Sequence, residues 1–218
     1  MKLSVVLPAY NEEGSIEETL RTLYAKLQEE KIDHEILVVN DNSKDNTLGL
    51  LTKIQETIPT LVVHTNHGPN GFGYAIRYGL ERFQGDCVAI MMSDLSDDPA
   101  DLVAFYRKMV NENLDCVFGS RFIKGGATYD YPKHKYLINR FANTIIRLLL
   151  GMSYNDSTNA FKLYKKSTIL GLKPFLSAHF NLTIELPLKA IIRGYSYGIL
   201  PNSWRNRKAG ESNLKIKE

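Results

Sequence analysis

Short apolar runs alternate with segments of helical period through the first 120 residues of the chain. Five of these runs are four to six residues long and are bounded by polar or turn-forming residues, which is the pattern of buried strands. They cover residues 3–7, 36–39, 61–64, 87–92 and 115–119.

The segments between the runs predict helices. Apolar residues recur at steps of four, three and four from Ile16 to Leu27, and Ser15 with Glu18 forms a capping-box pattern before them. A second helix is expected over residues 45–57, where Pro59 stops it, and a third follows the loop 67–73 and ends near Phe83. Asp98 followed by Pro99 predicts the start of a fourth helix.

Three polar loops, at residues 8–14, 40–46 and 93–98, each follow the carboxyl end of a predicted strand. In an open parallel sheet, ligands bind in the crevice outside those ends. The alternation therefore predicts an α/β fold with a mostly parallel, Rossmann-like sheet flanked by helices, and a ligand site at these loops. No linker or repeat divides the 218 residues, so we expect a single domain over 1–218.

Composition fits an ordinary soluble globular protein, with 44% hydrophobic and 23% charged residues. The opening apolar run is too short for a signal peptide, and the late run 145–152 is interrupted by Arg147, so we expect no membrane span. Cys87 and Cys116 lie among apolar residues without metal-ligand spacing, which predicts two buried free thiols in a cytoplasmic protein.

The net charge of +3 hides an asymmetry between two parts of the chain. Residues 128–218 hold 15 Lys and Arg against 5 Asp and Glu, a net charge of +10, and residues 1–127 carry −7. An acidic half suits a metal site, and a basic half suits phosphate groups or anionic lipid. A scatter of solvated lysines would give the same count.

Two local motifs are ambiguous when taken alone. Gly71 and Gly73 follow the third strand, whereas a dinucleotide fingerprint needs glycines after the first, and no P-loop triplet occurs. Taken alone, these glycines are more typical of turns than of ligand contacts. Asp94 stands where a buried strand opens into solvent, and suits a hard divalent cation, although the acidic segment also has the pattern of a capped helix start.

Taken together, eight ordered segments resemble family-two glycosyltransferases, and the later ones resemble dolichol- and polyprenyl-phosphate mannose synthases. The segments are Pro-Ala-Tyr-Asn-Glu at 8–12, Asn-Asp-Asn-Ser at 40–43 with Asp45 and Thr47, Gly-Phe-Gly at 71–73 with Ala75 and Gly79, Ser-Asp-Leu at 93–95, Gly-Ser-Arg-Phe at 119–122, Asp-Ser-Thr-Asn-Ala-Phe at 156–161 with Tyr164, Glu185, and Arg-Lys-Ala-Gly-Glu-Ser at 207–212 with Leu214.

The resemblance implies a GT-A fold in which 1–127 binds a nucleotide-diphosphate sugar, such as GDP-mannose or a UDP-sugar, and 128–218 is a basic acceptor half. It implies that Asp94 binds Mg²⁺ or Mn²⁺, that Arg207 neutralises the diphosphate, and that Arg121 faces an acceptor phosphate. The residues that it places around the donor nucleotide are Pro8, Tyr10, Glu12, Asp41, Gly71 and Gly73.

Two positions depart from the family pattern. An amide, Asn40, stands before Asp41 where the family has an acid pair, and Met92 stands where the metal motif has its first acid. A thioether is a poor ligand for magnesium or manganese. Asp94 then works with diphosphate oxygens and a nearby acid such as Asp97, or metal dependence is weakened, or transferase activity is lost.

The resemblance also implies displacement at the anomeric carbon with inversion, for which Asp94, Arg207 and Arg121 are the catalytic candidates. A polyprenyl phosphate acceptor is already largely ionised at pH 7 and needs no general base. A sugar hydroxyl in cell-wall or polysaccharide assembly needs one, and the candidates are then Asp97, Asp156 and Glu185.

The segment 134–150 has one apolar face with basic residues beside it. This pattern is typical of an interfacial helix at a membrane surface, and also of a core helix with basic flanks. With the first reading, the protein is peripheral on the cytoplasmic membrane face. No nucleic-acid partner is expected. A non-catalytic nucleotide-binding module is an alternative, whereas a nucleotidyltransferase is disfavoured because the loop 8–14 lacks arginine and lysine.

Overall fold

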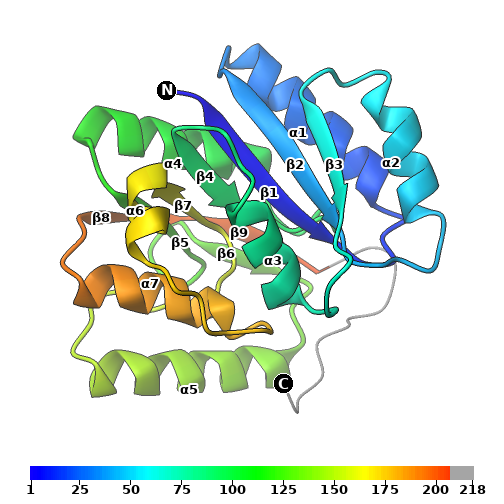
Figure 1. Ribbon diagram of the computed structural model, residues 1–218. Helices are drawn as coiled ribbons and strands as arrows, with labels where there is room; N and C mark the ends of the chain where they lie inside the picture. The colour runs from blue at the N-terminus through cyan, green and yellow to red at the C-terminus, as the bar shows by residue number, and fades with distance from the viewer. Residues whose placement is uncertain (207–218) are drawn as a thin grey trace.

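A computed structural model describes residues 1–206 and has a central seven-stranded sheet between two layers of helices (Figure 1). The strand order is β3-β2-β1-β4-β7-β5-β8. All neighbours pair in parallel except β7, which runs antiparallel to both β4 and β5. The sheet strands are β1 (Leu3–Ala9), β2 (His34–Asn40), β3 (Leu61–Thr65), β4 (Cys87–Ile90), β5 (Cys116–Ser120), β7 (Lys162–Lys165) and β8 (Tyr197–Pro201).

Apolar residues on opposite faces of the sheet strands build two separate cores. Leu3, Val5 and Leu7 of β1 pack with helices on one face, and Val6 packs with helices on the other. Strands buried on both faces need continuous apolar runs, which explains the pattern of the sequence. The first face is covered by α1 (Ile16–Glu29), α2 (Thr47–Gln55) and α4 (Pro99–Glu112), the second by α3 (Phe72–Leu80), α6 (Lys166–Gly171) and α7 (Leu182–Ile192).

The predicted strands and helices of the first 120 residues are confirmed, with bounds shifted by a few residues. The family's α/β architecture is confirmed as well. Asp98 caps α4, since its carboxylate accepts a hydrogen bond from the backbone N–H of Ala100 at 2.8 Å. Cys87 and Cys116 are buried free thiols, as expected. The motif at 207–214, with Arg207, lies outside the described residues.

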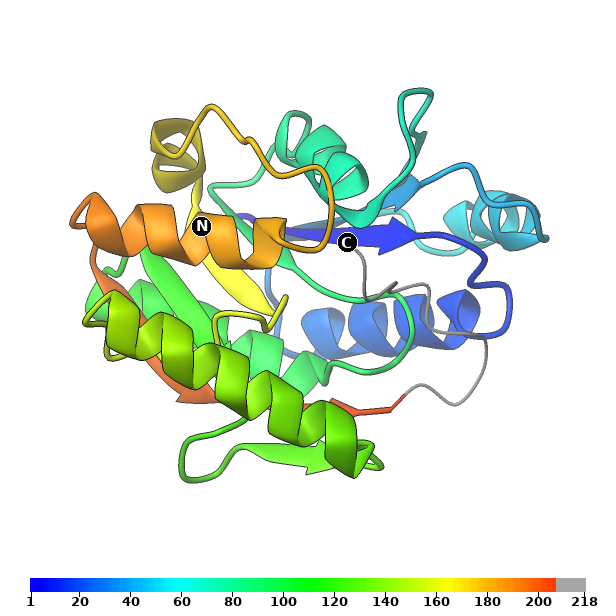
Figure 2. The same cartoon turned by 90° about the horizontal axis from the view of Figure 1, so that it is seen from below.

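A small second sheet and a peripheral helix lie outside the main sheet and the helices that cover it. Strands β6 (Ala127–Tyr129) and β9 (Ser203–Arg205) form a small parallel sheet. Helix α5 (Lys133–Leu149) lies at the periphery, outside the layers that cover the main sheet (Figures 1 and 2). Within residues 1–206, no helix is both long and apolar enough to span a bilayer.

Helix α5 turns its apolar face outward. Leu137, Ile138 and Phe141 keep 67%, 66% and 69% of their surface exposed, and Leu149 keeps 78%. The one buried residue of the helix is the polar Asn143. A core helix would bury the leucines and expose the amides. The interpretation of residues 134–150 as a core helix is therefore wrong.

Candidate active site

The three loops predicted to hold a ligand meet at one edge of the sheet. Because β2 and β4 pair with opposite edges of β1, the crevice between strands opens beside the end of β1. The Ser93 hydroxyl donates to the carbonyl of Pro8 at 2.8 Å, and the backbone N–H of Glu12 donates to the Thr47 hydroxyl at 2.8 Å. The loops after β1, β2 and β4 therefore form one continuous surface.

The predicted capping box at the start of α1 is wrong. Ser15 occupies the N-cap position, but its side chain makes no capping hydrogen bond. Its hydroxyl instead lies 2.9 Å from the Glu12 carboxylate and 3.1 Å from the carbonyl of Ser93. The Ser15 hydroxyl therefore does not accept from the N–H groups of the helix, and its contact with Ser93 ties the first loop to the acidic loop.

Asp41 fastens the end of β2 to the glycine loop. Its two carboxylate oxygens accept hydrogen bonds at 2.7 Å from the Asn66 amide and from the backbone N–H of Gly71. Gly71 has a φ of +145°, and a Cβ on Gly73 would lie 2.4 Å from the carbonyl carbon of Ala178. Both glycines therefore have structural reasons to be glycine, whatever they contact in a ligand complex.

The other predicted nucleotide contacts lie on the same edge. Pro8 belongs to the end of β1, Tyr10 is half-buried just beyond it, and Glu12 is buried. Together with Asp41, they surround the crevice at the carboxyl ends of β1 and β2. Their arrangement agrees with the predicted donor site, and their contacts to a nucleotide remain a prediction.

The acidic loop after β4 holds two carboxylates whose charges interact. Asp94 accepts a hydrogen bond from the backbone N–H of Ser96 at 3.1 Å, and Asp97 accepts one from that of Met92 at 2.9 Å. Burial raises the pKa of Asp97 to about 7, and the charge of Asp94 adds to the rise, although the Met92 hydrogen bond opposes it.

This pair fits a hard divalent cation, because a cation would relieve the cost of two carboxylates in one loop. No group of three or more His, Cys, Asp or Glu suited to a metal occurs among residues 1–206. The remaining oxygen ligands would then have to come from the donor diphosphate or water. Met92 is half-buried, whereas Met91 belongs to the core.

Sequence reasoning did not find the strand that runs beside this loop. β9 reaches the loop through an isolated bridge between Trp204 and Asp97, and the backbone N–H of Arg205 donates to the carbonyl of Ser96 at 3.0 Å. The stretch Ser-Trp-Arg is too short to carry a strand period, so the sequence offers no signal for it.

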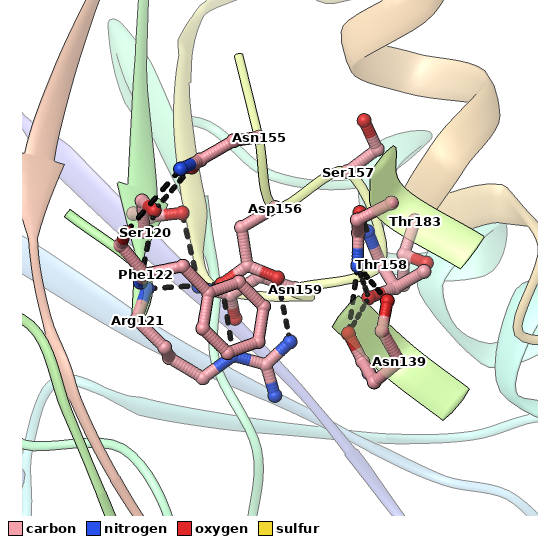
Figure 3. Close-up of polar contacts among 12 residues, drawn as sticks. Ser120, Arg121, Phe122, Asn139, Asn155, Asp156, Ser157, Thr158, Asn159 and Thr183 are labelled. Carbon is pink, nitrogen blue, oxygen red and sulfur yellow. Dashed lines mark hydrogen bonds and ion pairs between the residues drawn. The ribbon is translucent and has the colours of Figure 1, made fainter. Parts of the chain in front are cut away.

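Arg121 lies at the end of β5 and is paired with Asp156 (Figure 3). The Asp156 carboxylate accepts from the arginine Nη2 at 2.7 Å, from Nε at 2.9 Å, and from the backbone N–H of Arg121 at 2.9 Å. Burial alone would lower the pKa of Arg121, but the charge and hydrogen bonds of Asp156 outweigh it and raise the pKa. Asp156 therefore holds Arg121 in one orientation.

The three candidate bases differ in their surroundings. Asp156 is engaged by Arg121. Glu185 accepts from the backbone N–H groups of Leu176 and Ser177, at 2.9 and 2.6 Å, and pairs with Lys189. Burial would raise the pKa of Glu185, but these hydrogen bonds outweigh it and lower the pKa to about 2. Asp97, with a pKa of about 7, suits a base near neutral pH better than Glu185 does.

Helix α5 brings a second guanidinium to the same corner. The guanidinium carbon of Arg121 lies 5.2 Å from the ring centre of Phe122, and that of Arg140 lies 4.7 Å from it. Beside them, a cavity of about 370 Å³ is lined by Thr128, Asp130, Tyr131, Lys133, Tyr136 and Leu137. Two guanidinium groups, a pocket with aromatic lining and the exposed apolar face of α5 therefore lie next to one another.

The structure is a mostly parallel α/β fold whose polar loops and two acids lie at one sheet edge, where folds of this class bind ligands. Residues 4–170 match the domain described as Glycosyl transferase family 2, and the chain belongs to that family. This membership supports a glycosyltransferase over the alternative of a non-catalytic nucleotide-binding module.

Two curated relatives match nearly the whole chain. A dolichol-phosphate mannosyltransferase of Pyrococcus furiosus is 28% identical over 100% of this chain, and a polyprenol monophosphomannose synthase of Mycolicibacterium smegmatis is 28% identical over 96%. The chain spans 60% of the length of the first protein and 80% of the second.

Solved structures share the fold. Glucosyl-3-phosphoglycerate synthase from Mycobacterium tuberculosis, in complex with Mn²⁺, UDP and phosphoglyceric acid, superimposes with a TM-score of 0.70 at 21% identity, over 94% of this chain and 71% of that one. S. aureus TarS residues 1–349 superimpose with a TM-score of 0.65 at 19% identity, over 95% and 60%. The GT-A expectation agrees with these neighbours.

Proposed function

We propose that the protein transfers a hexose from a nucleotide-diphosphate sugar, GDP-mannose or a UDP-sugar, to a polyprenyl or dolichyl phosphate, with inversion at the anomeric carbon. The observation that carries this proposal is the exposed apolar face of α5 beside Arg121 and Arg140. The mannosyltransferase relatives support the same reaction class.

The donor lies at the edge formed by the loops after β1, β2 and β4. Pro8, Tyr10, Glu12 and Asp41 bind the base and ribose, with the Gly71–Gly73 loop beside them. Asp94 and Asp97 hold Mg²⁺ or Mn²⁺, which would supply Lewis-acid stabilisation of the leaving diphosphate. Arg207 neutralises the same charge, since a guanidinium suits phosphate oxygens.

The acceptor phosphate lies between Arg121 and Arg140. Asp156 orients Arg121, which spares the site the cost of ordering a long side chain when the acceptor binds. The phosphate oxygen is already ionised at neutral pH and attacks without a general base. The aromatic cavity beside Tyr131 and Tyr136 takes the isoprene units nearest to the phosphate.

The remainder of the lipid stays in the membrane, where α5 docks. The apolar face inserts at the cytoplasmic surface, and Lys135, Arg140 and Arg147 meet anionic headgroups. Each basic residue near such a surface contributes about 1 kcal/mol, which salt screens. Residues 1–127 then act as the donor half and 128–218 as the acceptor half of one domain.

One observation favours a second candidate function. Because Asp97 is a carboxylate with a pKa of about 7, it has the protonation behaviour of a general base. A transferase that acts on a sugar hydroxyl in cell-wall or polysaccharide assembly would use it in that role. In such an enzyme Asp97→Asn abolishes transfer at every metal concentration, whereas with a lipid phosphate acceptor transfer by the variant recovers as the metal concentration is raised.

The proposal is tested with Arg121→Ala. Because Arg121 contacts the acceptor phosphate and not the donor, transfer to polyprenyl phosphate should fall about 100-fold, and the dissociation constant for the nucleoside diphosphate should stay within about threefold of the parent. Arg107→Ala is the matched control, since Arg107 is exposed on α4 and pairs with Glu30 at the end of α1. Equal losses of donor and acceptor binding in folded Arg121→Ala would contradict the assignment.

Membrane docking is tested by flotation with liposomes. Binding to anionic vesicles should weaken as salt rises, and neutral vesicles should bind poorly. If the apolar face of α5 instead joins two copies of the chain, the protein is a dimer in solution and ignores both kinds of vesicle. That outcome would refute the membrane assignment.

A further inference from the structure

Lys162 is a lysine buried in the middle of the central sheet. It lies in β7 between β4 and β5 and keeps 1% of its surface exposed. Its ammonium donates to the backbone carbonyls of Ser157 at 3.1 Å and Thr183 at 3.0 Å, and also to that of Asn159. An ammonium has three N–H donors, and these three carbonyls use all of them.

An interior lysine is costly, because its charge leaves water. Burial lowers the pKa of Lys162 to about 7, which measures how strongly the site disfavours the charge. An apolar side chain of the same length would fill this position without that cost. The contacts of the ammonium therefore have to serve something other than packing.

The three carbonyls come from two parts of the chain that meet beside Arg121. Ser157 and Asn159 belong to the turn 156–159, whose first residue is the partner of Arg121, and Thr183 is in the first turn of α7 (Figure 3). The ammonium thus fixes this turn from the side of the sheet.

The other side of the turn is held by α5 and β5. Asn143, the buried residue of α5, donates to the Thr158 hydroxyl at 2.9 Å, and the Asn159 amide donates to the carbonyl of Gly119 at 3.0 Å. The turn is therefore held by Lys162, by α5 and by β5, the strand that ends just before Arg121. A shift of the turn would move Asp156, and Arg121 with it.

We infer that Lys162 is a positioning residue for the acceptor: it fixes the turn 156–159 so that Asp156 holds the Arg121 guanidinium toward the acceptor phosphate. The inference rests on the proposed role of Arg121. Lys162 itself touches no substrate in this arrangement, so its effect should appear in acceptor use and leave donor binding unchanged.

The test is Lys162→Met, which keeps the aliphatic length and removes the three donors. With polyprenyl phosphate, kcat/KM for the acceptor should fall about tenfold or more, because small displacements of a positioning group are costly. Nucleoside diphosphate affinity and slow hydrolysis of the donor should match the parent. Lys165→Met is the matched control, since Lys165 lies on the same strand and donates to Asn113, away from Arg121.

A second readout does not depend on the acceptor. In the parent, Arg121 is buried and paired, and should resist modification by phenylglyoxal, whereas Lys162→Met should expose it to labelling detected by mass spectrometry. Protected Arg121 together with unchanged acceptor kinetics would overturn the inference. If the parent ignores polyprenyl phosphate, the proposed function fails, and the labelling still decides whether Lys162 positions Arg121.

A third variant guards against loss of folding in Lys162→Met. Lys162→Arg keeps the positive charge, but its donors lie in a plane and cannot converge on three carbonyls as an ammonium does. It should fold, with acceptor kcat/KM between the parent and the methionine variant and with unchanged donor affinity. A folded arginine variant that loses donor and acceptor binding equally would show a general structural role and overturn the inference.

Discussion

Removing the charge of Asp156 should destabilise the protein strongly. The Asp156 side chain is fully buried and that of Arg121 is 7% exposed, so Asp156→Asn leaves a guanidinium in the interior without its counter-charge. Breaking a buried ion pair in this way costs about 3–5 kcal/mol of unfolding free energy. For a chain of this size, 1 kcal/mol shifts the melting temperature by about 2–4 °C, so we expect a fall of about 6–20 °C.

A variant of the other partner and a double variant together measure the interaction energy of the ion pair. Arg121→Met leaves a buried carboxylate and should cost a similar amount. In the double variant Arg121→Met/Asp156→Asn neither charge remains, and the amide oxygen introduced at position 156 still accepts the backbone N–H of residue 121. Its stability should recover to within about 2 kcal/mol of the parent, because removing both partners avoids the unpaired charge.

Urea unfolding of the parent and the three variants measures this cycle, and acceptor transfer is measured on the same samples. We expect a coupling energy of at least about 4 kcal/mol, because the two single losses far exceed the loss in the double variant. Transfer should not recover in the double variant, since the phosphate-binding guanidinium is gone. Additive losses of stability would show that the pair is not energetically coupled. Transfer at the parental rate by the stable double variant would refute the role of Arg121.

Three further predictions concern the acidic loop and α5. Because folding raises the pKa of Asp97 from 3.8 to about 7, its protonated form stabilises the fold at low pH and that contribution is lost as pH rises to about 7. Asp97→Asn should therefore gain about 3 kcal/mol relative to the parent between pH 5 and pH 8 in urea unfolding, and a constant difference would contradict the shift. Met92→Asp should tighten Mn²⁺ binding in calorimetry with nucleoside diphosphate present, and a folded variant of unchanged affinity would remove residue 92 from the metal site. Phe141→Ser should weaken liposome binding about tenfold, while Val110→Ser on α4, which removes a 46% exposed apolar residue, should leave it unchanged.

Elements with an uninterrupted local pattern were predictable from the sequence. Strands β1 and β4 are short runs buried on both faces, and α1 has a strict helical period, so each pattern depends only on neighbouring residues. The edge where their loops meet followed from the rule that parallel strands bind ligands at their carboxyl ends.

β7 was missed for a physical reason. β7 has only four residues and both begins and ends with a lysine, a residue type that usually indicates a solvent-facing position. Lys162 is buried because three carbonyls accept from its ammonium, two in the turn just before the strand and one in α7. The pairing of Asp156 with Arg121 spans 35 residues and leaves no local trace.

The orientation of α5 was open in the sequence. An apolar stripe with basic neighbours fits both a core helix and an interfacial one, because amphipathicity does not say which face is covered. Asn139 and Asn143 decide it, since they bind Thr158 and so turn the polar side toward the protein. The capping box failed because the Ser15 hydroxyl makes a tertiary contact, donating to the carbonyl of Ser93, and does not accept from the N–H groups of the helix.

The most direct test of the central claim is a transfer assay with purified protein, Mg²⁺ or Mn²⁺, and radiolabelled GDP-mannose and UDP-sugars. Polyprenyl phosphate in mixed micelles and a panel of soluble sugars are offered as competing acceptors. We expect label from one donor to enter the lipid fraction as a polyprenyl phosphate sugar, while the soluble sugars stay unlabelled. Label that appears only on a soluble hydroxyl acceptor would contradict it.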